Sequence, residues 1–200
     1  MLDIKLLKSP HPFHANSYLI SFDGEYAIID PTAPFDNDLI CGELKYILLT
    51  HGHFDHILEI DSWVENTNAS VIISEDEISL ISNPDLNCYR MYNGTNKAFS
   101  KEVSPVKDGD KLILGNTNIS VLSTPGHTLG SVVYLIDDVA FVGDTVFKGG
   151  GYGRYDLPTG NALMLRQSID KISSLDESIK MYPGHGGSTT VKEFKFDFYR

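Results

Sequence analysis

Short runs of hydrophobic residues, each bounded by Gly, Pro, Asn or Asp, follow one another through the first half of the chain. Such runs predict β-strands, because a strand needs only a few apolar residues between turn signals. The dipeptide Asp23-Gly24 predicts a hairpin turn, so the first strands are expected to be antiparallel. The predicted strands are residues 2–7, 17–22, 25–30, 44–50 and 70–73.

Apolar residues at helical spacing alternate with these strands. Positions 57, 60, 63 and 64 predict a helix over residues 57–66. Shorter helices are expected at 35–41 and from the acidic residues at 75–77 onward. Residues 83–100 have no firm period, which predicts helical fragments and loop over the surface.

The second half of the chain repeats this pattern of a strand cluster followed by a helix and a strand. Thr159 is expected to cap a helix with an apolar face of Ala162, Leu165, Ile169 and Ile172. A final helix is expected at about 189–197. The predicted strands are residues 110–114, 118–123, 131–136, 139–142 and 179–182.

Two similar blocks predict an α+β fold in which two mixed sheets pack face to face with helices outside, because each sheet needs its apolar face covered. The chain has 42% hydrophobic and 22% charged residues, an ordinary globular balance. Since no linker rich in Gly, Pro or Ser divides it, we expect one domain over residues 1–200.

The formal net charge of −11 disfavours nucleic acid and anionic membranes as partners, because the averaged surface repels polyanions. The first residues lack the features of a signal peptide, and no window approaches the ~20 apolar residues of a membrane span. We therefore expect a cytoplasmic protein without a membrane partner. Cys41 and Cys88 are too far apart in the sequence for a zinc knuckle or a redox pair of the C-x-x-C type. Both are expected to be reduced and inert.

The candidate chemistry is concentrated in His51-Gly52-His53-Phe54-Asp55-His56, between a predicted strand and a predicted helix. His51 and His53 are expected to project to one side of extended chain, while Asp55 and His56 enter the first helical turn. A single His at a strand end is usually structural, and Asp55 alone would suit a helix N-cap. Three imidazoles and a carboxylate this close together are costly to bury without a cation, so a metal site is predicted.

Three further residues of ligand type each follow an apolar strand. His127 and His185 come after Pro-Gly turns, and Asp144 follows residues 139–142. Each is a weak signal alone, but with the six-residue motif they complete a set for two metal ions. Two divalent ions about 3.5–4 Å apart repel each other unless an anion bridges them. The predicted ligands are His51, His53 and His127 for one ion, Asp55, His56 and His185 for the other, and Asp144 as the bridge.

Imidazole and carboxylate ligands without thiolate suit zinc, iron or manganese. Two divalent ions with two carboxylates and one hydroxide leave a net positive site, which draws small anionic substrates locally. His11 and His14, flanked by prolines, are expected to be loop residues without metal.

On these residues the chain resembles the metallo-β-lactamase superfamily. The superfamily signature H-x-H-x-D-H stands at residues 51–56, and its later His, Asp and His match His127, Asp144 and His185. The resemblance covers nearly the whole chain and implies a four-layer αββα sandwich, in agreement with the two-block pattern. It also implies two bound divalent metal ions, of which zinc is favoured over iron and manganese.

Within the superfamily, the segments around His127, Asp144, Arg154 and His185 are similar to those of single-domain glyoxalase II-like hydrolases. This implies cleavage of a small-molecule thioester, such as S-lactoylglutathione, by a metal-bridging hydroxide. Asp55 would then be both a ligand and the catalytic group that orients the hydroxide. The helical domain that contacts glutathione in two-domain relatives has no counterpart in these 200 residues, which disfavours glutathione as the thiol.

Lys148, Arg154 and Tyr155 are candidates for binding the carboxylate of a thiol carrier. The alternative interpretation of this Gly-rich stretch is a turn with incidental charge, and both interpretations stay open.

Other reactions of the superfamily also stay open. A persulfide dioxygenase with one iron, on the equivalents of His51, His127 and Asp144, is the main alternative, and a lactonase is a further one. A nuclease is disfavoured by the net charge. Antibiotic hydrolysis is disfavoured because zinc β-lactamases usually carry a Cys, or lack a bridging carboxylate, where Asp144 stands. A non-catalytic binding module is disfavoured because the ligand set is intact.

Overall fold

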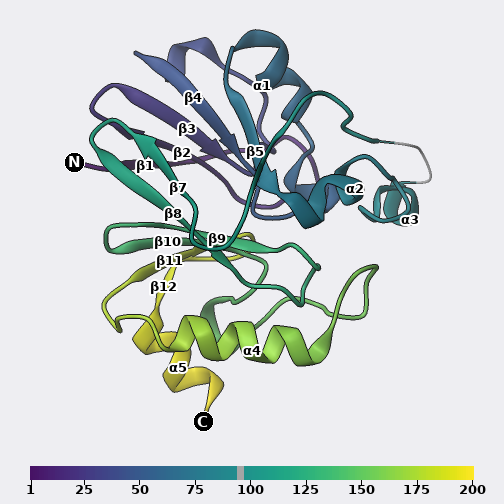
Figure 1. Cartoon of the computed structure of the whole chain (residues 1–200), viewed down its shortest axis with the longest axis vertical. Coiled ribbons are helices and arrows are strands. Elements are labelled where there is room, and N and C mark those ends of the chain that lie inside the picture. The colour runs from purple at the N-terminus through teal and green to yellow at the C-terminus, as the bar shows by residue number, and fades with distance from the viewer. Residues whose placement is uncertain (94–96) are drawn as a thin grey trace.

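A computed structural model describes residues 1–93 and 97–200 and contains two six-stranded mixed sheets (Figure 1). The first sheet has its strands in chain order. β1, β2 and β3 are antiparallel, while β3, β4, β5 and β6 run parallel. Its strands are β1 Asp3–Leu7, β2 Ser17–Phe22, β3 Glu25–Ile29, β4 Glu43–Leu48, β5 Ser70–Ser74 and β6 Ser104–Val106.

The second sheet has the order β12-β11-β10-β9-β8-β7. Only β10 and β11 are parallel in it, and the other neighbours are antiparallel. Its strands are β7 Lys111–Leu114, β8 Thr117–Ser123, β9 Val132–Ile136, β10 Val139–Gly143, β11 Lys180–Pro183 and β12 Thr189–Thr190.

Helices cover the outer face of each sheet. α1 (Ile60–Asn66), α2 (Ile78–Ile81) and α3 (Tyr89–Asn93) lie with the first sheet, and α4 (Ala162–Ser173) and α5 (Val191–Phe198) lie against the second (Figure 1). The predicted four-layer αββα sandwich is confirmed. Among the described residues, no helix combines the length and apolar character that crossing a membrane requires.

The strands of the first sheet are apolar on both faces, because both faces are covered. Alternate residues of one strand therefore enter different cores. Ile20 and Leu48 pack toward the second sheet, whereas Leu19 and Ile47 pack with Trp63 of α1. The continuous apolar runs in the sequence have this physical origin.

Several predicted element boundaries are wrong. Residues 35–41 form only a 3₁₀ turn at Asn37–Leu39 (η1), because Asp36 accepts the backbone N–H of Asp38 in a tight local turn. The helix predicted at 57–66 begins at Ile60, after a separate 3₁₀ turn (η2) at Phe54–His56. The sequence analysis did not predict the strands β6 and β12.

The helix cap expected at Thr159 is also displaced. Asn161 caps α4, and its side chain accepts the backbone N–H groups of Leu163 and Met164. Residues 89–93 form the short helix α3 within the stretch predicted as loop with helical fragments, and the part of that stretch at 94–96 lies outside the described residues.

Glu77, the last residue of the 3₁₀ turn η3 (Glu75–Glu77), links the two halves of the sandwich. Its side chain is buried and accepts the backbone N–H of Gly52 at 2.7 Å and that of Gly130 at 2.8 Å. Burial raises the pKa of Glu77, and these two hydrogen bonds oppose the rise. Gly52 follows β4 and Gly130 precedes β9, so one carboxylate fixes a loop from each sheet.

We expect Glu77→Ala to lower the free energy of unfolding by about 2–6 kcal/mol, because two buried N–H groups lose their acceptor at about 1–3 kcal/mol each. Urea denaturation of the metal-stripped protein measures this change. The matched control is Glu75→Ala, since Glu75 makes an exposed ion pair with Lys107. Equal denaturation midpoints for the two variants would contradict the proposed link between the sheets.

Candidate metal centre

The predicted metal motif follows the end of β4. Its backbone is held by neighbouring loops, since Phe54 donates its N–H to the carbonyl of Asn87 and Asp55 accepts the N–H of Ala15. Gly52 is required in this motif, because a Cβ there would lie 2.8 Å from side-chain carbons of Leu80 and Ile81. His51, His53 and His56 are consequently held in buried positions.

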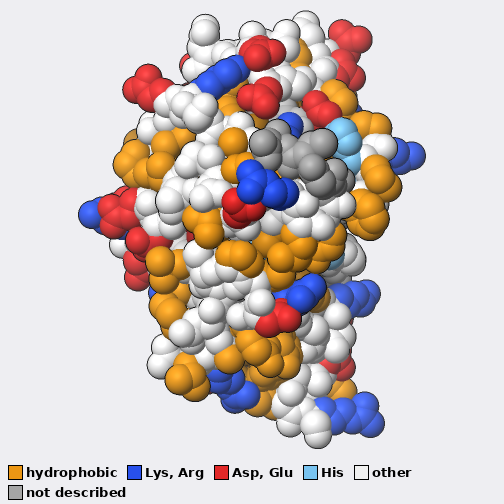
Figure 2. Space-filling model, turned by 90° about the vertical axis from the view of Figure 1, so that its right-hand side faces the viewer, with side chains coloured by type: hydrophobic (Ala, Val, Ile, Leu, Met, Phe, Trp, Pro, Cys, Tyr) orange, Lys and Arg blue, Asp and Glu red, His pale blue; other side chains and the backbone are white. Residues whose placement is uncertain are grey.

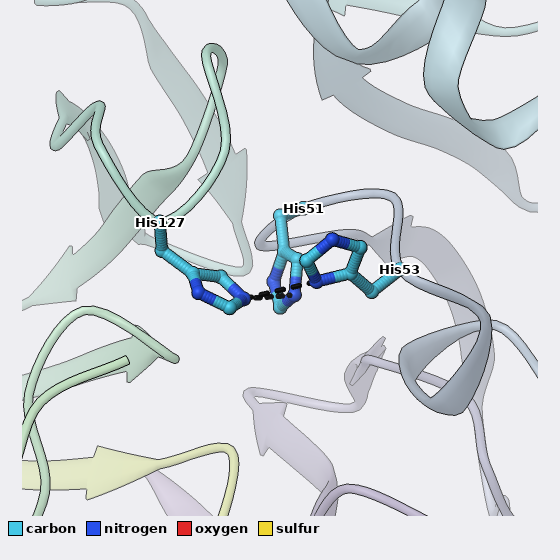
Figure 3. A group of neighbouring side chains, drawn as sticks. All are labelled: His51, His53 and His127. Carbon is cyan, nitrogen blue, oxygen red and sulfur yellow. Dashed lines mark hydrogen bonds between the residues drawn. The ribbon is translucent and has the colours of Figure 1, made fainter. Parts of the chain in front are cut away.

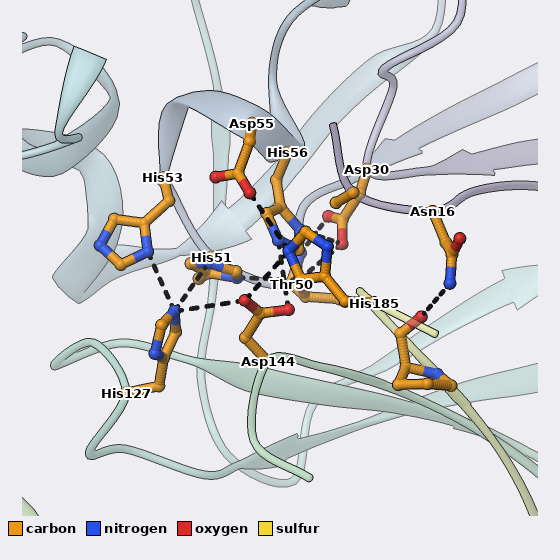
Figure 4. A network of polar contacts seen from close by, with 12 residues as sticks. Asn16, Asp30, Thr50, His51, His53, Asp55, His56, His127, Asp144 and His185 are labelled. Atoms are coloured by element: carbon orange, nitrogen blue, oxygen red, sulfur yellow. Dashed lines mark hydrogen bonds and ion pairs between the residues drawn. The ribbon is translucent and has the colours of Figure 1, made fainter. Parts of the chain in front are cut away.

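The other predicted ligands arrive from the second sheet. His127 lies in the loop between β8 and β9, Asp144 directly follows β10, and His185 follows β11. Figure 4 shows these side chains converging with those of the motif. The structure therefore brings all seven predicted ligands to one place, where β4, β10 and β11 end.

Three histidines form the first group of potential ligands (Figure 3). Nδ1 of His53 lies 2.9 Å from Nε2 of His127, which lies 3.2 Å from Nε2 of His51. Tetrahedral zinc with Zn–N bonds of about 2.0–2.1 Å would hold its nitrogen ligands roughly 3.3 Å apart. Both distances are therefore close to the ligand spacing of a zinc site.

Burial also keeps these three rings in the form that binds metal. It lowers the pKa of His51 well below its ordinary value, that of His53 to about 3, and that of His127 below its ordinary value. A neutral imidazole offers a lone pair to a cation.

Asp55, His56 and His185 form the second group of potential ligands. Nε2 of His185 lies 3.2 Å from Oδ2 of Asp55. Asp144 lies between the two groups: its Oδ1 is 3.3 Å from Nε2 of His56, and its Oδ2 is 3.4 Å from Nε2 of His185 and 3.7 Å from Nε2 of His127. One carboxylate thus reaches both groups, as a bridging ligand must.

The two carboxylates of the cluster are ionised. Burial alone would raise the pKa of Asp144, but His56 and His185 hold it well below its ordinary value. Burial likewise opposes ionisation of Asp55, and the hydrogen bond from His185 nevertheless lowers its pKa. For His56, burial favours the neutral ring, while Asp144 and Asp30 raise its pKa well above the ordinary value.

Asp30 supports this centre, and the sequence analysis missed it. Its buried carboxylate accepts the backbone N–H and the hydroxyl of Thr50, at 2.8 and 2.7 Å, and lies 2.8 Å from Nδ1 of His56. That contact turns Nε2 of His56 toward the other ligands. Asp30 follows β3, which is parallel to β4, and its role depends on that pairing; in the sequence it is only the last residue of the predicted strand 25–30.

A backbone group orients His127 in the same way. The carbonyl of Arg154 accepts from Nδ1 of His127 at 2.6 Å, which leaves Nε2 free to face His51 and His53. Gly153 makes this approach feasible, since a Cβ there would lie 2.0 Å from the carbonyl oxygen of Asp144. The loop after Asp144 therefore shapes the centre through its backbone.

The unpaired atoms of the cluster fit bound metal. Nε2 of His53, Nε2 of His56 and Oδ1 of Asp144 are buried and have no hydrogen-bond partner among the described residues. Buried polar atoms without partners are costly, and a cation offsets that cost for the two atoms that face the other ligands, Nε2 of His56 and Oδ1 of Asp144. The donor set of imidazoles and carboxylates suits zinc, iron or manganese.

A cavity of about 480 Å³ opens above the ligands and is lined by His53, Asp55, His127, Asp144 and His185 together with residues of the surrounding loops. Of the predicted substrate-binding residues, Arg154 lines this cavity. Lys148, in the 3₁₀ turn η4 (Lys148–Gly150), and Tyr155 are outside its described lining, and Tyr155 borders a separate depression beside α4.

The two remaining histidines lie in the loop after β1. Nε2 of His11 lies 2.5 Å from a carboxylate oxygen of Glu59, and His14 lines the cavity beside Phe13. Neither belongs to a group of potential metal ligands among the described residues.

Comparison with known proteins identifies the family. The model of the metallo-β-lactamase superfamily matches residues 11–185, and the chain belongs to this superfamily, whose members typically bind divalent metals. The chain is 35% identical over 191 residues to the probable metallo-hydrolase YqgX of Bacillus subtilis (strain 168), covering 90% of this chain and 89% of YqgX. The resemblance inferred from the sequence is thus confirmed at the level of the superfamily.

Two solved structures are similar over almost the whole chain. BLEG-1 B3 metallo-β-lactamase has a TM-score of 0.86 and 30% identity, covering 98% of this chain and 97% of its own. TTHA1623, in a di-iron-bound form, has a TM-score of 0.81 and 28% identity, covering 94% of this chain and 96% of its own. The fold is therefore the metallo-β-lactamase fold.

We expect Gly184→Ala to reduce metal affinity by more than about tenfold. The new Cβ would lie 2.2 Å from Oδ1 of Asp144 and 2.6 Å from Cε1 of His56, so it must displace ligands, and displacement of groups that only support ligands already costs about 10–100-fold. Competition with a colorimetric zinc chelator measures the change.

The matched control is Gly187→Ala, whose Cβ would meet only Cδ of Lys148 at 3.8 Å. It is expected to bind zinc as the wild type does. Equal zinc affinity of both variants would show that the atoms beside Gly184 do not hold metal.

Proposed function

We propose that this chain is a thioester hydrolase that works with two divalent metal ions, with zinc favoured over iron and manganese. The observation that supports this most directly is the pair of ligand groups that share Asp144 at the floor of an open cavity. When bound, the ions would supply a water-derived nucleophile at neutral pH and polarise the scissile carbonyl.

Asp55 is the proposed catalytic carboxylate. It is held ionised, and one of its oxygens contacts His185 while its side chain also lines the cavity. A carboxylate in this position can both bind metal and accept a hydrogen bond from the attacking water, which aligns that water with the substrate carbonyl.

A leaving group that departs as an anion requires no proton donor from the lining of the cavity. Besides the ligands, its described ionisable side chains are His14, Cys88, Tyr92, Tyr152 and Arg154. Burial raises the pKa of Cys88 to about 11, so this thiol stays protonated and inert. A thiolate needs little protonation when it departs, so its departure requires none of these groups as a general acid. An amine or an alkoxide needs a proton donor.

A second candidate reaction is β-lactam hydrolysis. It is favoured by the 30% identity to BLEG-1 over almost the whole chain. It is opposed by Asp144, a carboxylate in the bridging position between the two ligand groups. Persulfide oxidation with one iron is a third, and the similarity to ETHE1 from Myxococcus xanthus, with 29% identity and a TM-score of 0.75 over 99% of this chain and 84% of its own, is consistent with it.

We expect His53→Ala and Asp144→Ala each to lower thioester turnover by more than about 100-fold. Loss of a residue that only orients a metal ligand already costs up to about 100-fold, and these two residues are predicted to be ligands themselves. Thiol release and elemental analysis of the same samples measure rate and bound metal. His11→Ala is the matched control, because His11 lies outside the groups of potential ligands. Wild-type turnover by either ligand variant at matched metal content would refute the two-metal proposal.

The reaction class is decided by one panel of substrates on the zinc-loaded and iron-loaded protein. We expect release of thiol from acyl-thioesters, with little cleavage of a cephalosporin or a lactone and no oxygen uptake with a persulfide. Oxygen uptake without thioester cleavage would establish the dioxygenase instead, and cephalosporin cleavage alone would establish the β-lactamase.

A further inference from the structure

We infer that Asp156 sets the substrate preference of this cavity toward thioesters of uncharged thiols with apolar acyl groups, because it engages the guanidinium of Arg154. The inference rests on the proposed thioesterase function and names the substrate class that the site would take. It differs from the expectation that Arg154, Lys148 and Tyr155 bind the carboxylate of a thiol carrier.

The walls of the cavity are apolar and largely aromatic. Phe13, Tyr92 and Tyr152 are 61%, 46% and 47% exposed, so large rings stand open to solvent at its rim. Covering exposed apolar surface of this kind with an apolar ligand is favourable, because it removes that surface from water. The apolar residues of the lining are Pro12, Phe13, Phe54, Phe147 and Leu157, with the rings of Tyr92 and Tyr152.

These rings extend from the rim down to the ligands. The ring of Phe54 lies 5.4 Å from that of Tyr92, and the ring of Phe147 lies 6.1 Å from that of His185. Figure 2 shows hydrophobic side chains gathered across the middle of the face turned to the viewer. A flat acyl group that reaches the metal ligands would therefore contact aromatic surface along its length.

Arg154 is the one arginine or lysine in the described lining, and three of its five N–H donors are already engaged. Nε and Nη2 donate to the two carboxylate oxygens of Asp156 at 2.9 and 2.8 Å, and Nη1 donates to the hydroxyl of Tyr92 at 3.3 Å. A bidentate pair uses the two parallel N–H groups with which arginine recognises carboxylates. A substrate carboxylate would have to displace Asp156 to be bound in the same way.

The other charges do not replace this cation. Lys148 lies outside the described lining of the cavity, and the chain carries a net charge of −11. A carboxylate on the distal part of a substrate would meet Asp156 and an acidic protein, while the positive metal centre is occupied by the reacting carbonyl. The charge distribution at the rim therefore disfavours anionic thiol carriers and leaves neutral ones unaffected.

The test uses thioesters that differ only in charge. Benzoyl and acetyl thioesters of N-acetylcysteine, which has a free carboxylate, are compared with those of its methyl ester, which is neutral. For the wild-type zinc protein we expect kcat/KM to be about tenfold higher for the methyl ester than for the free acid, and higher for benzoyl than for acetyl.

Asp156→Asn releases Arg154 and is expected to shift the ratio of the two kcat/KM values about fivefold toward the free acid, the effect of one exposed charge pair. Added salt should reduce this shift, because it screens exposed charges. The matched control is Asp170→Asn: Asp170 pairs with Arg166 on α4, outside the cavity lining, and its loss should leave the ratio as it is.

Each failure has its own signature. If the wild type cleaves thioesters but prefers the free acid or the acetyl group, or if Asp156→Asn leaves the ratio unchanged, the inferred preference is overturned and the proposed thioesterase stands. If no thioester of either charge is cleaved by metal-loaded protein, the proposed function itself fails and the inference fails with it.

Discussion

The structure depends on the gathering of five imidazoles and two carboxylates where two sheets meet, four of the imidazoles being buried. The nitrogens and oxygens that face one another lie about as far apart as two ligands of one metal ion. Buried groups of this kind repel each other or stay unpaired unless a cation lies among them. Since the first sheet supplies four of these ligands and the second supplies three, the centre also joins the halves of the molecule. Metal binding and the packing of the sandwich are thus expected to be thermodynamically linked.

The ligands are oriented largely by backbone groups and by buried carboxylates. Asp30 fixes His56, the carbonyl of Arg154 fixes His127, and Glu77 holds the loops on either side through Gly52 and Gly130. Each of these contacts joins segments that are distant in sequence. The geometry of the centre is therefore a property of the whole sandwich, and the six-residue motif alone does not determine it.

The sequence predicted the two-sheet sandwich and the positions of the seven ligand-type residues, because both leave local patterns. Apolar runs mark buried strands, and His or Asp directly after such a run must lie at a sheet edge. Boundaries set by tertiary contacts left no such pattern: β12 is two residues long, and the turn at η1 depends on one Asp side chain. Asp30 was missed because its role follows from the parallel pairing of β3 with β4, which the order of residues does not reveal. Spacing also does not set the direction of exposed side chains, so Lys148 and Tyr155 were candidates for binding substrate although they are outside the described lining of the cavity.

The floor and the rim of the cavity come from different segments of the chain. The ligands occupy short connections immediately after strands, whereas the rim is formed by the loop after β1, by α3 and by the loop that contains Arg154 and Leu157. Insertions and substitutions in those outer segments can alter which molecules fit while the reactive floor keeps its arrangement. Such a division lets a single hydrolytic chemistry diversify across many metabolites, since selection on substrate choice and selection on reactivity act on separate stretches of the gene.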